Sequence, residues 1–218
     1  MPDRYDTSGT PEGQFQPGSD GKVLRNKLGI VDPQEMEDVE FDRLVQFESM
    51  LFDELAMDQR LTVDDLCDWH KRWLGPVYEW AGDYRTVTLS RDGFPFAAVP
   101  QLPKLMQEFG EKYLQVYTPC DGMDREELVN AMAICHVEFI LIHPFRDGNG
   151  RLGRLLVTVM ALQAGMPVLD FEPIEKDKAR YIEAIHAGHA GDYAPMKRVF
   201  SDVLDFSLQQ ASRNESNE

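Results

Sequence analysis

Residues 143–154 read His-Pro-Phe-Arg-Asp-Gly-Asn-Gly-Arg-Leu-Gly-Arg. This stretch places three arginines within nine residues of a chain that has 38 acidic and only 22 basic residues. The net charge of −16 disfavours a general nucleic-acid or anionic-membrane binder, because those partners are themselves negatively charged. A ligand that carries phosphates therefore needs a local basic site, and residues 143–154 are the candidate.

The residue types in this stretch suit a polyphosphate. Arg151 and Arg154 are three positions apart, so they share one face of the helix that we expect from Arg151 to about Ala164. The unpaired amides of a first helical turn already attract anions. Gly148 and Gly150 allow further backbone amides to turn towards the same point.

Two further side chains add chemistry to the basic site. Asp147 offers a carboxylate oxygen of the kind that holds Mg²⁺ against phosphates. His143 ends the preceding apolar helix, and a neutral imidazole there can take a proton from an incoming hydroxyl. The same residue types also occur singly as structural histidines, solvated arginines and turns, so it is their coincidence that indicates a site.

Outward from this stretch, apolar spacing and capping residues predict a mostly helical chain. Alternating and β-branched residues from Tyr84 to Leu89, a turn at Asp92-Gly93 and a return from Phe94 to Ala97 predict a hairpin with an edge strand. The fold class is therefore all-α with a small β-hairpin. The expected helices cover residues 33–57, 62–73, 100–117, 124–142, 151–164, 173–187 and 192–210.

Composition sets the domain organisation. The 218 residues suffice for one core, and we expect a flexible arm over 1–21, a single domain over 22–210 and a frayed tail over 211–218. Three scattered cysteines favour reduced thiols and a cytoplasmic location. No apolar run approaches the length of a membrane span, and the first residues lack a secretory signal pattern.

A dinucleotide-binding fold is a rival interpretation, because Gly148, Gly150 and Gly153 satisfy G-x-G-x-x-G. It needs strands at Phe139–Ile142 and Pro167–Asp170. Five residues separate Ile142 from Gly148, however, and the apolar stripe before the motif fits a helix better. Too few residues follow Asp170 for a doubly wound sheet.

The stretch resembles the Fic signature, His-x-Phe-x-(Asp/Glu)-Gly-Asn-Gly-Arg-x-x-Arg, at every defined position. Val77-Tyr-Glu-Trp-Ala-Gly82 is similar to the segment before the Fic flap, and Lys27-Leu-Gly-Ile30 to a common Fic lead-in. The similarity covers roughly residues 20 to 205, and it implies a helical Fic core with a hairpin flap.

This resemblance implies a protein adenylyltransferase that uses ATP and Mg²⁺. AMP would pass to a Ser, Thr or Tyr hydroxyl of a target protein, and pyrophosphate would leave. His143 would deprotonate the hydroxyl and Asp147 would hold Mg²⁺; Asn149 and the backbone at Gly148 and Gly150 would form an anion hole. Gly150 stands where the related Doc-like kinases carry Lys. The residues expected around the nucleotide are Phe145 (a core anchor of the loop), Gly148, Asn149, Gly150, Arg151 and Arg154 (on the β- and γ-phosphates) and Tyr181 (beside adenine).

The resemblance also implies partners. The hairpin, with Leu89, Phe94 and Phe96, would be the flap that pairs with an extended segment of the target protein. Ser8-Gly-Thr-Pro-Glu12-Gly13 matches the inhibitory string of many Fic proteins, whose Glu pairs with the second motif arginine, here Arg154. An antitoxin chain is an equal alternative for inhibition.

Two questions stay open at this point. A toxin acting in its own cell and an effector delivered into another cell are both compatible with the sequence. A catalytically silent nucleotide-binding module is the alternative function, since binding and turnover need not go together.

Overall fold

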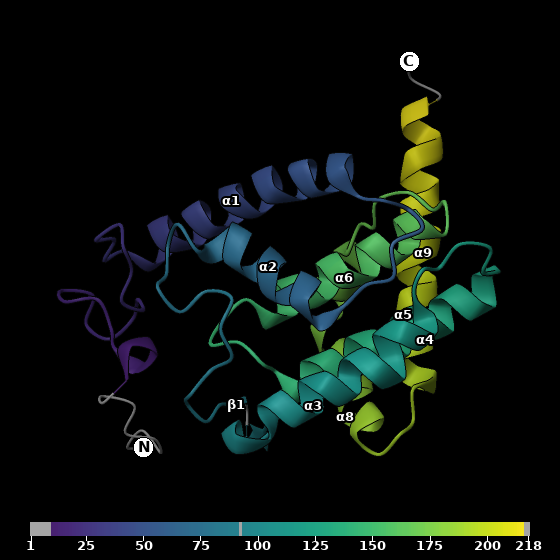
Figure 1. Ribbon diagram of the computed structural model, residues 1–218. Coiled ribbons are helices and arrows are strands. Elements are labelled where there is room, and N and C mark those ends of the chain that lie inside the picture. Colours follow the sequence, from purple (N-terminus) through teal and green to yellow (C-terminus); the bar gives the residue numbers. More distant parts are fainter. Residues whose placement is uncertain (1–9, 92, 216–218) are drawn as a thin grey trace. The chain divides into compact units, whose positions relative to one another are not determined.

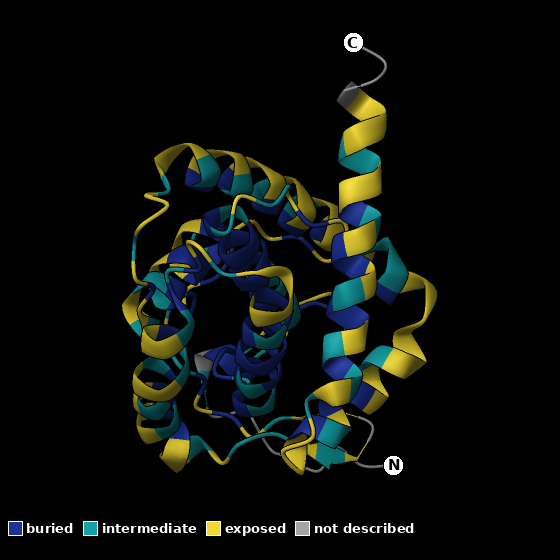
Figure 2. Cartoon of the chain, turned by 90° about the vertical axis from the view of Figure 1, so that its right-hand side faces the viewer, coloured by how far each residue is buried: buried dark blue, intermediate teal, exposed yellow. Residues whose placement is uncertain are grey.

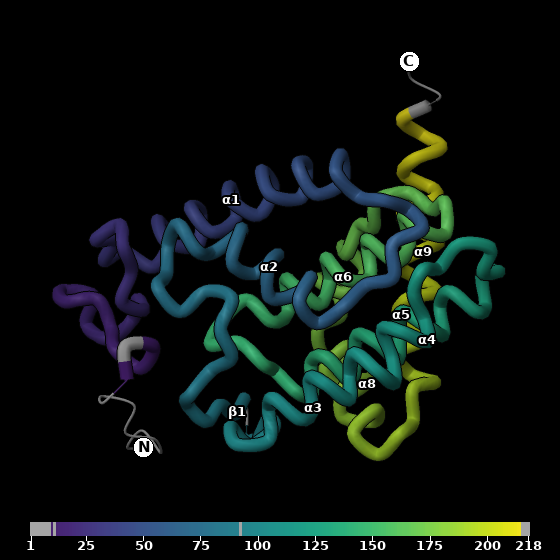
Figure 3. The backbone as a smooth tube through the Cα atoms, in the orientation of Figure 1, coloured from purple at the N-terminus to yellow at the C-terminus, as the bar shows by residue number. Residues whose placement is uncertain are grey.

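The computed structural model describes residues 10–91 and 93–215, and Figures 1 and 3 show their path. The described chain is helical, with a two-stranded sheet, as the sequence predicts. It divides into two compact units. The first comprises the described parts of 1–55, 63–107 and 142–152, and the second those of 56–62, 108–141 and 153–218.

The first unit carries the motif stretch up to Leu152. Its N-terminal long helix, α1, begins as its capping residues predict: the Asp32 carboxylate accepts the amides of Gln34 at 3.0 Å and Glu35 at 2.9 Å, and Pro33 takes the first helical position. Helix α1 packs against α2 within this unit (Figure 1). Its elements are η1 (Pro11–Gly13), α1 (Pro33–Glu54), α2 (Val63–Leu74), β1 (Ser90–Arg91), β2 (Phe94–Pro95), η2 (Val99–Gln101), most of α3 (Leu102–Phe109) and the first turn of α6 (Asn149–Gln163).

The hairpin is shorter than predicted. Ser90 pairs with Pro95 and Arg91 with Phe94, while the expected strand over 84–89 is not a strand. The backbone amides there have other partners: the Arg85 amide donates to the Pro144 carbonyl at 2.8 Å, and the next amide donates to a side chain. The alternating residue pattern predicted a strand here. Such a pattern does not reveal that acceptors from other segments compete for the backbone amides.

The second unit is built around α5, which is buried on nearly every side. From Leu128 to Val137 every residue except Asn130 is buried, so the predicted apolar stripe extends around the helix. Helices α7 and α8 pack against α9 in this unit. Its elements are η3 (Gly110–Leu114, a π-helical turn), α4 (Gln115–Tyr117), α5 (Arg125–Ile142), α7 (Glu172–Lys176), α8 (Lys178–His189) and α9 (Ala194–Glu215), with the remainder of α3 and α6.

Several helix boundaries differ from expectation. The predicted helix over 173–187 is two helices, because Asp177 leaves helical geometry and its carboxylate caps α8 through the Arg180 amide at 3.1 Å. Helix α9 continues past Gln210 as far as Glu215, and Figure 2 shows residues 212–214 of this extension as exposed. The domain boundaries at residues 22 and 210 stay predictions.

Two exclusions rest on the described residues. None of the helices in residues 10–91 and 93–215 is long and apolar enough to cross a membrane. The dinucleotide-binding interpretation is wrong, because Phe139–Ile142 lies in α5 and Pro167–Asp170 forms no strand. The fold that G-x-G-x-x-G requires around it is therefore missing from this part of the chain.

Candidate active site

His143 begins the loop that joins α5 to α6, and its backbone is strained. Its φ of 53° is left-handed, which is uncommon for any residue other than glycine. The buried Arg85 holds this conformation: Nε donates to the His143 carbonyl at 2.7 Å. The same guanidinium donates to the Val87 carbonyl at 2.7 Å and the Ala97 carbonyl at 2.6 Å, on the two sides of the hairpin. Arg85 thereby ties the base of the hairpin to the loop.

The His143 side chain is half-buried and faces the hairpin. Its imidazole stacks on the Phe96 ring, with centroids 3.7 Å apart and planes 9° apart. The stacked Phe96 ring covers one face of the imidazole, while both ring nitrogens lie on its edge.

Phe145 anchors the middle of the loop in the core. It is fully buried and stacks on the His70 ring at 4.0 Å. The Gly82 amide donates to His70 Nδ1 at 2.8 Å, so Nε2 carries the proton and donates to the Asp147 carbonyl at 3.1 Å. Burial lowers the pKa of His70 to about 4, which keeps this ring neutral near pH 7. The buried Asn149 side chain bridges the amide and carbonyl of Phe145, at 2.9 and 2.8 Å.

Gly148 occupies a position that excludes a side chain. Its φ is 79°, and an added Cβ would lie 2.9 Å from the Trp73 ring. Its amide donates to Asp147 Oδ1 at 2.5 Å. The Gly148 amide and the Asn149 side chain both have partners within the loop. The resemblance implies instead that both groups would face an anion.

Asp147 is the carboxylate that suits a metal. Its side chain is 50% exposed, beside the start of α6. No group of three His, Cys, Asp or Glu side chains in residues 10–91 and 93–215 has the spacing of a metal cage. A single accessible carboxylate fits Mg²⁺, which protein sites often hold through one or two carboxylates together with substrate phosphates.

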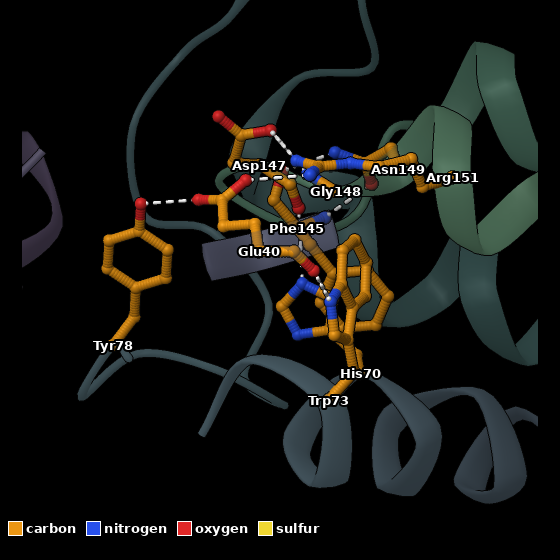
Figure 4. Close-up of polar contacts among 9 residues, drawn as sticks. All are labelled: Glu40, His70, Trp73, Tyr78, Phe145, Asp147, Gly148, Asn149 and Arg151. Atoms are coloured by element: carbon orange, nitrogen blue, oxygen red, sulfur yellow. Dashed lines mark hydrogen bonds and ion pairs between the residues drawn. The ribbon is translucent and has the colours of Figure 1, made fainter. Parts of the chain in front are cut away.

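Arg151 lies in a network that Figure 4 displays. Its Nη1 pairs with the Glu40 carboxylate at 2.7 Å, and its Nη2 lies 3.4 Å from Asp147 Oδ1. The guanidinium lies over the Trp73 ring, 4.7 Å from its centre. The other Glu40 oxygen accepts the Tyr78 hydroxyl at 2.5 Å.

The N-terminal segment reaches the same loop. The buried Glu12 carboxylate accepts the amide and the hydroxyl of Thr86, and the Glu12 carbonyl accepts Arg146 Nε at 2.8 Å. These contacts differ from the arginine pairing that the inhibitory resemblance implies. Ser8, the first residue of that string, lies outside the described residues. Inhibition through Ser8 and Glu12 stays a prediction.

Arg154 and Tyr181 belong to the second unit. Arg154 continues α6 one turn beyond Arg151, and its guanidinium lies 5.9 Å from the centre of the Phe171 ring. The Tyr181 hydroxyl is 2.7 Å from Nε2 of the buried His136, whose Nδ1 donates to the Gly153 carbonyl at 3.0 Å. Burial lowers the pKa of His136 to about 4. The expected roles of Arg154 and Tyr181 in nucleotide binding stay predictions.

The remaining flap residues are half-buried. Leu89 accepts the Phe96 amide through its carbonyl at 3.2 Å, which extends the hairpin pairing by one bond. The Phe94 and Phe96 rings meet edge-on at 6.2 Å. Docking of a target on these residues stays a prediction.

Sequence reasoning missed three residues that shape the loop: Glu40, His70 and Arg85. Each is buried, and each bonds to a partner distant in sequence. A buried charge needs such partners, but the sequence gives no sign of which acids and arginines are buried. For His70 a weak signal existed in its place among Trp69 and Trp73, two large core side chains.

Comparison with known proteins matches this loop to a family. The family model described as "Fic/DOC family" matches residues 60–161, which include the whole signature stretch. The chain carries a Fic domain. The helical fold with a small hairpin is the one that Fic domains of known structure share.

Curated relatives of this Fic domain carry adenylyltransferase names. The protein adenylyltransferase VbhT of Bartonella schoenbuchensis is 30% identical over 174 residues, which cover 77% of this chain and 35% of the relative. The probable protein adenylyltransferase Fic of Escherichia coli is 26% identical over 208 residues, covering 94% of this chain and 96% of the relative. The chain spans about a third of the length of VbhT and of the Caenorhabditis fic-1 relatives, at 35% and 28%.

Solved structures agree on the fold. The N-terminal Fic domain of an effector protein from Bartonella sp. AR 15-3 has a TM-score of 0.72 at 26% identity, covering 87% of this chain and 89% of the other. BepC of Bartonella tribocorum, solved with bound AMPPNP, has a TM-score of 0.68 at 25% identity, covering 87% and 94%.

Proposed function

We propose that this chain is a protein adenylyltransferase that transfers AMP from ATP to a Ser, Thr or Tyr hydroxyl of a target protein. The observation that carries the proposal is a single loop that holds a half-buried imidazole, an accessible carboxylate and an ordered arginine at the start of a helix. Such transfer depends on positioning and on charge neutralisation more than on covalent chemistry by the protein.

In this mechanism His143 takes the proton of the target hydroxyl. The hydroxyl oxygen attacks the α-phosphorus in line, a new phosphorus–oxygen bond forms, and the bond to the bridging oxygen of the β-phosphate breaks. Pyrophosphate leaves and keeps the electron pair of the broken bond on that oxygen. The amides at the start of α6 and the guanidiniums of Arg151 and Arg154 bind the phosphates and offset their negative charge locally.

Mg²⁺ and ATP are the proposed cofactors. Asp147 would hold the metal, which when bound neutralises phosphate charge and orients the leaving group. Asn149 keeps the loop in shape through its bonds to the Phe145 backbone, and the Phe145 ring anchors the loop on His70 of α2. Tyr181 would line the adenine site.

The relatives support this proposal. VbhT and the Escherichia coli relative are both named as protein adenylyltransferases, and BepC was solved with an ATP analogue. The target would dock on the flap at Leu89, Phe94 and Phe96, and an antitoxin chain would be a second partner. A cytoplasmic site of action, in the producing cell or in a recipient cell, completes the proposal.

The test compares ATP labelled at the α-phosphate with ATP labelled at the γ-phosphate. Incubation with cell lysate and α-labelled ATP should label a protein, whereas γ-labelled ATP should not. The His143→Ala variant should bind ATP but transfer no label. Transfer from γ-labelled ATP would indicate kinase chemistry, and ATP binding without any transfer by the unmodified protein would favour the silent binding module.

A further inference from the structure

Glu40 is a buried carboxylate on α1, 111 residues from its partner in the signature, and its side chain is 8% exposed. Both carboxylate oxygens have partners: Oε2 pairs with Arg151 at 2.7 Å and Oε1 accepts the Tyr78 hydroxyl at 2.5 Å. The Glu40 carbonyl accepts Trp73 Nε1 at 2.9 Å. A buried charge held at this many points has a fixed position (Figure 4).

Arg151 contacts two carboxylates at unequal distances. Its contact with the buried Glu40 is 2.7 Å, while that with the half-exposed Asp147 is 3.4 Å. Asp147 lies in the loop two residues before α6, and Arg151 lies in the first turn of α6, so the two side chains are already within ion-pair distance of each other. The short contact with Glu40 and the Trp73 ring together hold the guanidinium, and its contact with Asp147 is the longer of the two.

We propose that Glu40 is a positioning residue that keeps the contact between Arg151 and Asp147 long, so that the arginine stays available for nucleotide phosphates and the carboxylate for the metal. This inference rests on the proposed function for the identity of the ligand. Without Glu40, Arg151 closes onto Asp147 and the two groups neutralise each other.

Tyr78 supports Glu40 in turn. Burial, together with the neighbouring carboxylate, keeps the pKa of Tyr78 well above its ordinary value, so its hydroxyl remains a donor throughout the working pH range. The Tyr78 hydroxyl therefore fixes the rotamer of Glu40. The effect of removing it should be smaller than that of changing Glu40 and in the same direction.

The experiment compares binding of ATP, ADP and AMP to the full chain by calorimetry, with Mg²⁺ and with EDTA. Glu40→Gln should weaken ATP and ADP binding about tenfold and AMP binding less than about twofold, because Arg151 meets phosphates beyond the first. The loss of ATP affinity should be larger with Mg²⁺ than in EDTA, because Arg151 paired with Asp147 also weakens the binding of the metal. Tyr78→Phe should weaken ATP binding about threefold.

Three controls separate positioning from general damage. Glu79→Gln changes the neighbouring 80%-exposed carboxylate that pairs with Lys27, and should leave all three affinities unchanged. In an Arg151→Ala background, Glu40→Gln should cause no further loss of ATP binding, because it acts through the arginine. If Glu40→Gln fails to fold, Tyr78→Phe carries the same comparison.

Equal losses for ATP and AMP, unchanged or tighter ATP binding, or additive losses in the double variant would overturn the inference. A loss for ATP that is the same in EDTA as with Mg²⁺ would overturn the part that concerns Asp147. These outcomes do not depend on AMP transfer. If the unmodified protein transfers no AMP but the phosphate-dependent loss appears, the proposed function fails while the inference about Glu40 stands.

Discussion

The two ends of the signature loop are held by opposite kinds of contact. At His143 a buried cation, Arg85, donates to uncharged backbone carbonyls. At Arg151 a buried anion, Glu40, accepts from the arginine itself. The first contact depends on the backbone, so it fixes the loop whatever ligand is present. The second depends on charge, so it affects how strongly Arg151 can bind a negatively charged ligand.

The largest effect should come from the His143 end. Arg85→Ala leaves the carbonyls of His143, Val87 and Ala97 without a buried donor, which should lower the free energy of unfolding by about 4 kcal/mol. Denaturant unfolding measures this. Arg72→Ala removes a surface arginine that pairs with Glu54, and it should lower the free energy of unfolding by about 1 kcal/mol. Similar losses for the two variants would contradict the assigned role of Arg85.

The middle of the loop should respond next. Gly148→Ala combines a left-handed backbone with a close approach to Trp73, so stability should fall by about 2–3 kcal/mol. Gly122 has a similar φ of 76° with no atom within 4 Å of an added Cβ, so Gly122→Ala should lose about 1 kcal/mol. The difference between the two variants measures the close approach to Trp73 and Leu74. Equal losses for the two variants would show that these side chains move aside freely.

Buried histidines in both units should make stability depend on pH. His70 and His136 have folded pKa values of about 4, below the unfolded value of 6.5. Below pH 6.5 the unfolded chain binds protons that the folded chain does not, so stability falls as pH decreases towards 4. Each ring should remove about 2 kcal/mol between pH 7 and pH 5.

Unfolding of the unmodified protein at pH 7 and pH 5 tests this dependence. His70→Gln should remove the contribution of His70 to the difference in unfolding free energy between pH 7 and pH 5, and leave the contribution of His136. A pH difference that His70→Gln leaves unchanged would mean that the imidazole beneath the loop titrates freely.

The smallest expected change in stability is at the hairpin side of His143. Phe96→Ala should cost about 1 kcal/mol of stability but lower kcat about tenfold with little change in KM for ATP, because it removes the ring that orients the imidazole. Phe96→Tyr keeps the ring and should retain kcat. An equal fall for both variants would point to the flap surface rather than to the stacking contact.

The sequence predicted the elements whose signals are local. Asp32-Pro33 capped α1 as expected, and the signature stretch placed the loop and its charges. It failed where partners are distant. Arg85 and His143 are 58 residues apart, and the bonds of the 84–89 backbone to other segments replaced the predicted strand. Glu40 looked like one more acid on an acid-rich helix, because nothing local marks which acid is buried.

The most direct test of the account is mass spectrometry of lysate proteins after incubation with ATP and Mg²⁺. The unmodified protein should add the mass of one AMP to a Ser, Thr or Tyr of a target, and His143→Ala should add none while its ATP affinity stays within about twofold. Equal AMP addition by the His143→Ala variant would contradict the central claim.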